Sequence, residues 1–193
     1  MEFRKENIRF WSMTIIFSLS MTLITCFSHY IKVNPDTDMF RICKSFVFYN
    51  KSPSIPRGIY LRVPRLWVTS GDYVIYSPPS DVTDIAFNRG WIKSKKITFI
   101  KRVRGLAGDT YSADLTKGFC INNRFFGNIA IIDGKGRLMP MRLGEHHVPH
   151  NEFLPIGDNP ASPASFDGRY TGTVPMDNIK AKVIPIFTEM MIP

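Results

Sequence analysis

Ser54 is the first residue of the chain that could do chemistry, because it lies on a turn between two apolar segments, in NKSPSIPRGIY (residues 50–60). Pro56 restricts the backbone φ and Gly58 permits a tight return, so a hydroxyl on this turn has little freedom. A serine hydroxyl is a weak nucleophile near neutral pH and needs a neighbouring base. Without a base, the segment is typical of an ordinary Ser/Pro turn.

The histidines are poor candidates for that base. His29 follows an apolar run, and the other three share GEHHVPHNE (residues 144–152) with Pro149. HHxxH resembles a metal-binding pattern, but the proline prevents a regular helix from aligning the ligands. We therefore expect His146, His147 and His150 to form a solvated loop with no metal site.

Lys101 is the better candidate, since ITFIKRVRGLAGD places it after Phe99 and Ile100 in an apolar segment. Successive side chains of a strand point to opposite faces, so Lys101 can be buried while Arg102 reaches solvent. Burial lowers the pKa of a lysine and yields a neutral amine that can accept a proton. The alternative is a lysine on an edge strand that extends its ammonium group into solvent.

Asp167 and Arg169 stand two residues apart in SPASFDGRYTG (residues 162–172). In an extended segment they share one face and can form an ion pair that orders the turn. A solvent-exposed salt bridge of little energetic weight is the alternative interpretation.

Short apolar segments rich in β-branched and aromatic residues, bounded by Pro, Gly, Asp or Asn, predict a mainly β domain. Residues 80–96 have weak apolar periodicity and could form a short helix or a loop. Pro185 favours an edge position for the last strand. The predicted strands lie within residues 40–49, 58–63, 71–77, 96–103, 118–123, 128–133 and 181–187.

Residues 10–28 form an uncharged run long enough to cross a membrane as one helix, in which Ser and Thr hydroxyls can bond to backbone carbonyls of the preceding turn. No cleavage pattern of small residues follows, so an uncleaved anchor is favoured over a secretory signal. Basic residues before the run favour a cytoplasmic N-terminus. We predict a cytoplasmic tail at 1–9, a transmembrane anchor at 10–30 and an extracytoplasmic domain at 31–193.

The formal net charge of +9 comes from scattered basic residues, and this pattern does not favour nucleic acid as a partner. Anionic lipid headgroups fit better. Cys26, Cys43 and Cys120 have no metal-ligand spacing. We expect Cys43 and Cys120 to be free thiols, with a disulfide between them as the alternative.

Four segments, taken together, resemble the type I signal peptidases and in particular the TraF-like peptidases of plasmid conjugative transfer. They are SIPRGIY around Ser54, KRVRGLAGD (101–109), GRLMP (136–140) and SFDGRYTGTVP (165–175). With the N-terminal run, the similarity covers nearly the whole chain. The resemblance implies a signal-peptidase-like all-β catalytic domain with one N-terminal transmembrane helix and no cofactor.

The resemblance also implies roles for individual residues. Ser54 and Lys101 correspond to the nucleophile and general base of a Ser-Lys dyad. Ser52 would help the Ser54 N–H to hold the oxyanion, and Ser165 would support the lysine amine. Asp167 corresponds to an acidic residue important for activity. Arg169 would be its structural partner.

By this resemblance the chain is a serine endopeptidase of the bacterial inner membrane that acts on the periplasmic side. It would process a membrane-bound, pilin-like precursor through an acyl-enzyme, with other transfer or secretion components as possible partners. Two alternatives stay open. The substrate's own amino terminus could replace water and give a cyclic pilin, or the chain could be a non-catalytic assembly factor of a secretion or pilus apparatus.

Overall fold

The computed structural model describes residues 18–22, 25–26, 46–64, 67–159 and 165–189, and the chain forms two compact units, Met1–Ser45 and Phe46–Pro193. In the first unit, residues 18–22 and 25–26 are helical. There the Thr22 and Thr25 hydroxyls donate to the Ser18 and Met21 carbonyls at 2.8 and 3.0 Å, as expected from the sequence. The predicted tail, most of the predicted anchor and Cys43 lie outside the described residues.

Within these ranges, no helix has the length and apolar character needed to span a membrane.

The second unit is mainly β, as the sequence predicted. Its two α-helices are α3 (Ser80–Asn88) and α4 (Gly168–Thr171), and one turn of 3-10 helix spans Met176–Asn178. The strands are β1 Val47–Asn50, β2 Gly58–Val63, β3 Tyr73–Tyr76, β4 Phe99–Leu106, β5 Thr110–Asp114, β6 Gly118–Ile121, β7 Arg124–Gly127, β8 Gly144–His147, β9 Glu152–Ile156, β10 Val174–Pro175 and β11 Ile179–Thr188.

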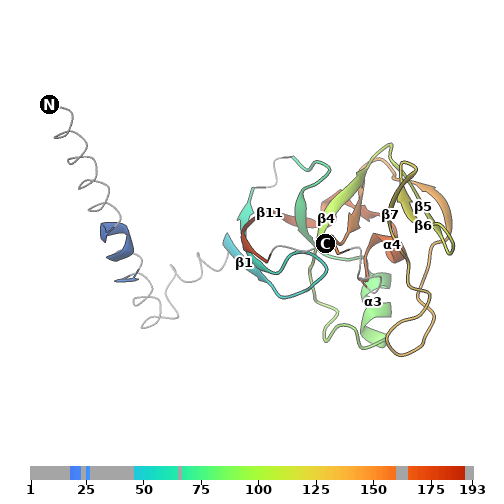
Figure 1. The fold of residues 1–193 in the computed structure, drawn as a ribbon, viewed down its shortest axis with the longest axis horizontal. Helices are drawn as coiled ribbons and strands as arrows, with labels where there is room; N and C mark the ends of the chain where they lie inside the picture. Colours follow the sequence, from blue (N-terminus) through green and yellow to red (C-terminus); the bar gives the residue numbers. More distant parts are fainter. Residues whose placement is uncertain (1–17, 23–24, 27–45, 65–66, 160–164, 190–193) are drawn as a thin grey trace. The chain divides into compact units, whose positions relative to one another are not determined.

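Two antiparallel sheets build this unit. The larger has the strand order β1-β2-β11-β3-β4-β9-β10, and the smaller has the order β7-β6-β5-β8. Figure 1 shows β1 and β11 at one end of the unit, β5 to β7 at the other, and α3 to one side. The central strands β3 and β4 lie side by side, with Val74 opposite Lys101.

Buried side chains cover both faces of the larger sheet, as the period-2 alternation of strands requires. Tyr73 and Ile75 pack with Tyr60 and Ile100 on one face, and Val74 and its neighbours pack on the other. A third cluster fills the space between β5 and β6 of the smaller sheet and β9 of the larger one. The central strands are therefore held rigidly from both sides.

The prediction of an edge position for β11 is only half right. The strand lies between β2 and β3, but β3 pairs with it only from Ile179 to Val183. Beyond Val183 it pairs with β2 alone, and the register shifts between Pro185 and Phe187. A proline has no N–H to donate, so it is tolerated where one side of the strand is unpaired and the ladder is irregular.

Two other local predictions were wrong. Residues 128–133 are not a strand, because only Ile132 forms an isolated bridge, with Leu138, around a turn that contains Gly134 and Gly136. The histidine segment is not simply a loop, since His146 and His147 belong to strand β8. His147 lies opposite Thr110 of β5, and β8 is the last strand in the order of the smaller sheet. The segment therefore forms an edge of that sheet.

Candidate active site

The turn that carries Ser54 is organised by Asn50, a residue that the sequence analysis did not single out. The buried Asn50 side-chain amide donates to the carbonyls of Ser52, Ile55 and Pro56 at 2.9, 3.3 and 3.1 Å. Its Oδ1 accepts from the Ser52 N–H at 3.0 Å. A single side chain thus satisfies four backbone groups of the turn, which fixes the turn from inside.

Ser54 and Ser52 interact with each other in this arrangement. Ser54 is buried, and its Oγ lies 2.9 Å from Ser52 Oγ. The Ser54 N–H donates to Ser52 Oγ at 3.3 Å. The two groups predicted to hold an oxyanion therefore lie together. An incoming oxyanion would have to take the place of Ser52 Oγ at the Ser54 N–H, because that donor is already occupied.

Lys101 lies on β4 and is 6% exposed, which confirms the predicted burial. Its Nζ donates to Ser165 Oγ at 3.0 Å. Among the described residues, no carboxylate forms an ion pair with Lys101 and no hydrogen bond joins it to Ser54. Burial lowers the pKa of Lys101 to about 8, while the Asp167 carboxylate opposes this effect.

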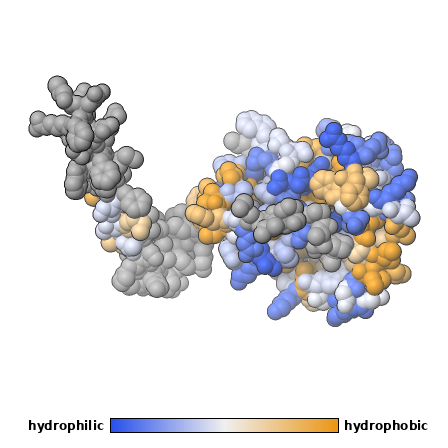
Figure 2. Space-filling model, in the orientation of Figure 1, coloured by the Kyte–Doolittle hydropathy of each residue, from blue (hydrophilic) through white to orange (hydrophobic). Residues whose placement is uncertain are grey.

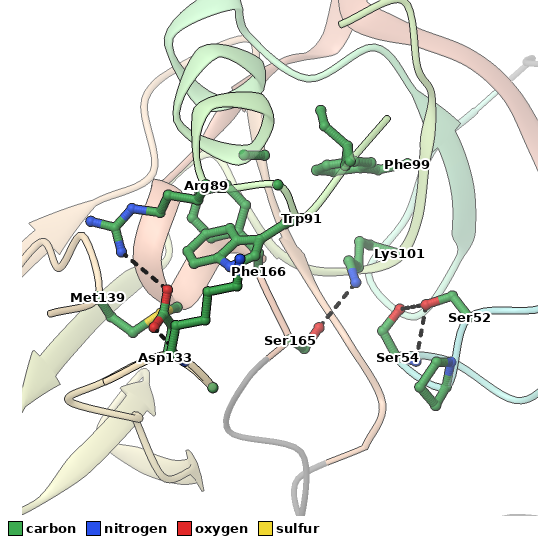
Figure 3. A pocket seen from close by; sticks show the side chains of 16 residues that line it. Ser52, Ser54, Arg89, Trp91, Phe99, Lys101, Asp133, Met139, Ser165 and Phe166 are labelled. Carbon is green, nitrogen blue, oxygen red and sulfur yellow. Dashed lines mark hydrogen bonds and ion pairs between the residues drawn. The ribbon is translucent and has the colours of Figure 1, made fainter. Parts of the chain in front are cut away.

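Ser54 and Lys101 line the same cleft, which has a volume of about 560 Å³. Figure 3 shows their side chains together at one end of the cleft, beside Ser52 and Ser165. Trp91 and Phe166 form its middle part, with ring centroids 4.9 Å apart. A second cavity of about 370 Å³ adjoins this one and is also lined by Ser54 and Lys101. The serine and the lysine therefore lie where two hollows meet.

Asp167 and Arg169 form the ion pair that the sequence allowed, but it is buried and lies at the start of helix α4, not in the extended segment that we expected. Asp167 is 1% exposed and Arg169 is 2% exposed. Arg169 Nε donates to Asp167 Oδ1 at 2.9 Å, and its NH2 donates to Oδ2 at 3.1 Å. Asp167 is also the N-cap of α4, where its carboxylate accepts from the Arg169 N–H. The pair fixes the segment that begins at Ser165.

Gly157 and Asp158 connect the nucleophile turn to this ion pair, and sequence reasoning missed both. The Gly157 N–H donates to Asp167 Oδ2 at 2.9 Å, and the Asp158 N–H donates to the Ser54 carbonyl at 2.7 Å. A Cβ on residue 157 would lie 2.7 Å from the Ser54 carbonyl oxygen and 3.0 Å from Ser165 Oγ. Only glycine fits there, because the backbone passes between two site serines.

The Asp158 carboxylate is itself fixed by three side chains on the other face of the sheet. Arg102 Nε and Arg104 NH2 donate to it at 3.0 and 2.8 Å, and the Tyr73 hydroxyl donates to it as well. The sequence KRVR indicates cations but not their partner Asp158, which is 56 residues from Arg102 and 54 from Arg104. These contacts hold the backbone behind Ser54 in place.

The remaining predicted groups lie elsewhere. Cys120 is a free thiol on the smaller sheet, and its possible partner Cys43 lies outside the described residues. Among the described residues, no group of three His, Cys, Asp or Glu side chains is arranged to hold a metal ion. The structure thus brings together all six predicted site residues, Ser52, Ser54, Lys101, Ser165, Asp167 and Arg169.

Comparison with known proteins identifies similar chains. The family model described as signal peptidase, peptidase S26, matches residues 38–188. Two Escherichia coli proteins named plasmid transfer protein TraF are each 31% identical, over 153 and 148 residues, and each match covers 72% of this chain and 81% of the relative. A signal peptidase I structure from Enterococcus faecalis V583 aligns with 60% of this chain and 95% of its own length. At 16% identity and a TM-score of 0.35, that structure supports no conclusion.

Proposed function

The chain belongs to the signal peptidase family, peptidase S26, and from this we propose that it is a serine endopeptidase with Ser54 as nucleophile and Lys101 as general base. The observation that carries the proposal is the buried lysine. Lys101 lies in one cleft with Ser54, has no carboxylate partner among the described residues, and has a pKa lowered to about 8. About a tenth of its amine is therefore neutral at pH 7 and about half at pH 8, and the neutral form is the one that a general base requires.

In the proposed mechanism, Lys101 Nζ takes the proton of Ser54 Oγ while that oxygen attacks a peptide carbonyl. No hydrogen bond joins the two groups within the described residues, and we propose that it forms when the substrate binds, as catalytic hydrogen bonds often do. Ser52 Oγ and the Ser54 N–H then hold the oxyanion. The protonated Lys101 delivers its proton to the leaving amine of the substrate and becomes neutral again. It then activates a water molecule, which hydrolyses the acyl-enzyme.

Ser165, Asp167 and Arg169 act by position in this proposal. Ser165 Oγ accepts the Lys101 hydrogen bond at 3.0 Å, which directs the amine. Asp167 and Arg169 hold the backbone of that segment and of Gly157. None of these three side chains hydrogen-bonds to Ser54 in the described part of the chain.

We further propose that the enzyme works at the bacterial inner membrane, on the periplasmic side. The uncharged run at 10–28 supports an anchor. An apolar face of the larger sheet also supports it: Val47, Leu61 and Ile184 form one cross-strand row of exposed side chains. Tyr49, Ile59 and Phe187 form the next row. Figure 2 shows apolar residues gathered at the β1 end of this unit.

The substrate proposed is a pilin-like, membrane-bound precursor of a conjugative transfer system, because the relatives are plasmid transfer proteins. Mass spectrometry of the product separates hydrolysis from cyclisation, since a ring is one water lighter than the linear product. A reporter enzyme fused after Pro193 tests the orientation and should be active only outside the cytoplasm.

The deciding experiment compares the parent with Ser54→Ala and Lys101→Ala proteins in cells that make the precursor. Both variants should leave the precursor unprocessed while reaching the membrane in normal amounts. Ser94→Ala is the matched control, because Ser94 is an exposed serine outside the cleft lining. Normal processing by either site variant contradicts the dyad and favours a non-catalytic assembly role.

A further inference from the structure

The cleft has a second, charged end that the proposed chemistry does not use. Figure 3 shows Arg89, Asp133 and Met139 on the side of the cleft opposite Ser54 and Lys101, with Trp91 and Phe166 between them. This end is formed by the residues that follow α3 and by the loop at residues 131–139. Lys135, on the same loop, also lines the cleft.

The carboxylate of Asp133 is neutralised within its own loop. Arg137 Nε donates to Asp133 Oδ2 at 2.8 Å, and the backbone N–H groups of Lys135 and Arg137 donate to Oδ1 at 2.9 and 3.0 Å. The hydrogen bonds from Arg137 lower the pKa of Asp133 to about 2. This carboxylate closes its own loop and offsets one of the three positive charges of Arg89, Lys135 and Arg137 at this end of the cleft.

Two further cations face the cleft. Arg89 packs over the Trp91 ring at 5.1 Å and donates one hydrogen bond to the Leu138 carbonyl, but its nearest Asp133 oxygen is 3.8 Å away. Lys135 is exposed, and its ammonium group has no hydrogen bond or ion pair to any described residue. With Arg137 paired to Asp133, Arg89 and Lys135 give this end of the cleft a net positive charge.

We propose that Lys135 and Arg89 form a subsite for an acidic side chain of the peptide substrate. The inference rests on the proposed peptidase function, and it adds a specificity that the dyad does not supply. The guanidinium of Arg89 is fixed by Trp91 and Leu138 and presents preorganised donors, while the flexible side chain of Lys135 adjusts to the carboxylate. The aromatic wall between this end and Ser54 accommodates the intervening residues of the peptide.

The net positive charge at this end of the cleft should favour acidic over basic peptides. An attraction of this kind gives about a tenfold preference at low salt, and salt weakens it. Replacing Lys135 by glutamate places a carboxylate beside the already paired Asp133. The introduced carboxylate then offsets the remaining charge of Arg89, so the variant should lose the preference for an acidic residue at this substrate position.

The test measures binding to the full chain in detergent, with Ser54→Ala as the background so that no peptide is consumed. The probes are dye-labelled, alanine- and serine-based decapeptides that carry Glu, Gln or Lys at one position in turn, and binding is followed by fluorescence anisotropy. At one position, Glu should bind about tenfold more tightly than Lys at low salt. Lys135→Glu should remove this preference, and 0.5 M salt should reduce the preference of the parent to about twofold.

Lys117→Glu is the matched control, since Lys117 is an exposed lysine on the turn between β5 and β6 of the smaller sheet. It makes the same change of net charge and should leave the preference intact. The inference is overturned if no position favours Glu, or if Lys135→Glu keeps the preference of the parent.

A separate measurement distinguishes the failure of the proposed function. The best-binding peptide is incubated with protein that retains Ser54, and its cleavage is compared with that by Ser54→Ala. A charge preference without Ser54-dependent cleavage supports the subsite and contradicts the peptidase. Ser54-dependent cleavage of Glu, Gln and Lys peptides at equal rates supports the peptidase and overturns the subsite.

Discussion

Lys101 and Asp167 are both buried ionisable groups of one site, but the protein compensates their charges in opposite ways. Asp167 accepts four hydrogen bonds, from the Gly157 N–H and from three donors of Arg169. Lys101 makes one side-chain hydrogen bond, to a neutral hydroxyl. A compensated charge is suited to holding structure, whereas an uncompensated one has a shifted pKa and is suited to proton transfer.

The largest expected effect is on activity and tests the uncompensated charge. Lys101→Arg keeps the positive charge and much of the volume, but arginine does not lose its proton under these conditions. We expect single-turnover cleavage of a precursor peptide in detergent to fall by at least about 10³-fold. Lys101→His should retain a trace. Substantial turnover by the arginine variant, shown to be folded, refutes Lys101 as the base.

The pH profile of the parent enzyme follows from the same lysine. Lys101 must be neutral to accept a proton, so activity should rise as pH increases through the lowered pKa of about 8. A histidine base would give a midpoint near 6.5. The midpoint reports the coupled site, and a rate that is already at its maximum at pH 6 would point away from lysine.

Asp167→Asn tests the compensated charge and should act mainly on stability. The substitution leaves the Arg169 guanidinium, 2% exposed, without its carboxylate. Breaking a buried ion pair in this way costs about 3–5 kcal/mol in the free energy of unfolding, which urea denaturation measures. The double variant Asp167→Leu/Arg169→Met should recover only part of this loss, because it removes both charges but leaves the Gly157 and Arg169 backbone N–H groups without their acceptor. A loss below about 1 kcal/mol for Asp167→Asn would show that the pair is dispensable.

The sequence could predict those strands whose signals lie within the segment itself. Strand β2 was predicted with its observed bounds because GIYLRV carries its own local signals. Strand β9, EFLPI, was missed because Pro155 argues against a strand unless it lies at an irregularity, and the ladder opposite it shifts between Val103 and Gly105. That irregularity depends on the partner strand, and it leaves no mark in the segment itself.

The site residues also differ in how much the sequence reveals about them. Ser54, Lys101 and Asp167 could be found because their chemistry and the motifs around them are local in the chain. Asp158 could not, since the fold alone brings it to Arg102 and Arg104, 56 and 54 residues away. Asn50 acts on backbone groups of its own turn, two to six residues away, but its side chain has no catalytic chemistry that would single it out. An asparagine just before a Ser/Pro turn is a weak signal of an Asx-type turn, and nothing in the sequence marks Asp158.

Lys101→Met should stabilise the protein while abolishing activity. The fall in the pKa of Lys101 from 10.5 to about 8 corresponds to about 3 kcal/mol of lost stability wherever the native state must carry the proton. Because the unfolded state binds more protons between these two values, the stability of the parent rises with pH across that window. The gain for Lys101→Met should therefore be full below pH 8 and vanish above pH 10.5, as urea denaturation at several pH values will show. Equal stability of the two proteins at pH 7 contradicts a costly buried ammonium.

The smallest expected effect concerns the hydrogen bond from Lys101 Nζ to Ser165, the one side-chain hydrogen bond of Lys101 within the described part of the chain. Ser165→Ala removes the hydroxyl that accepts from Lys101 Nζ at 3.0 Å, and nothing else in the described site replaces it. The amine loses its orientation, so kcat should fall about tenfold, on the scale of one lost hydrogen bond to a charged group. The ammonium form loses its acceptor as well, so the pKa of Lys101 should fall further and move the midpoint of the pH profile down by about half a pH unit. A purely structural role for Ser165 would lower the free energy of unfolding and leave that midpoint unchanged, so the two readouts separate the interpretations.

Ser94→Ala, at an exposed serine outside the cleft lining, should change neither the rate nor the midpoint. An unaltered rate and midpoint in Ser165→Ala would mean that Lys101 is positioned by the packing of β4 alone.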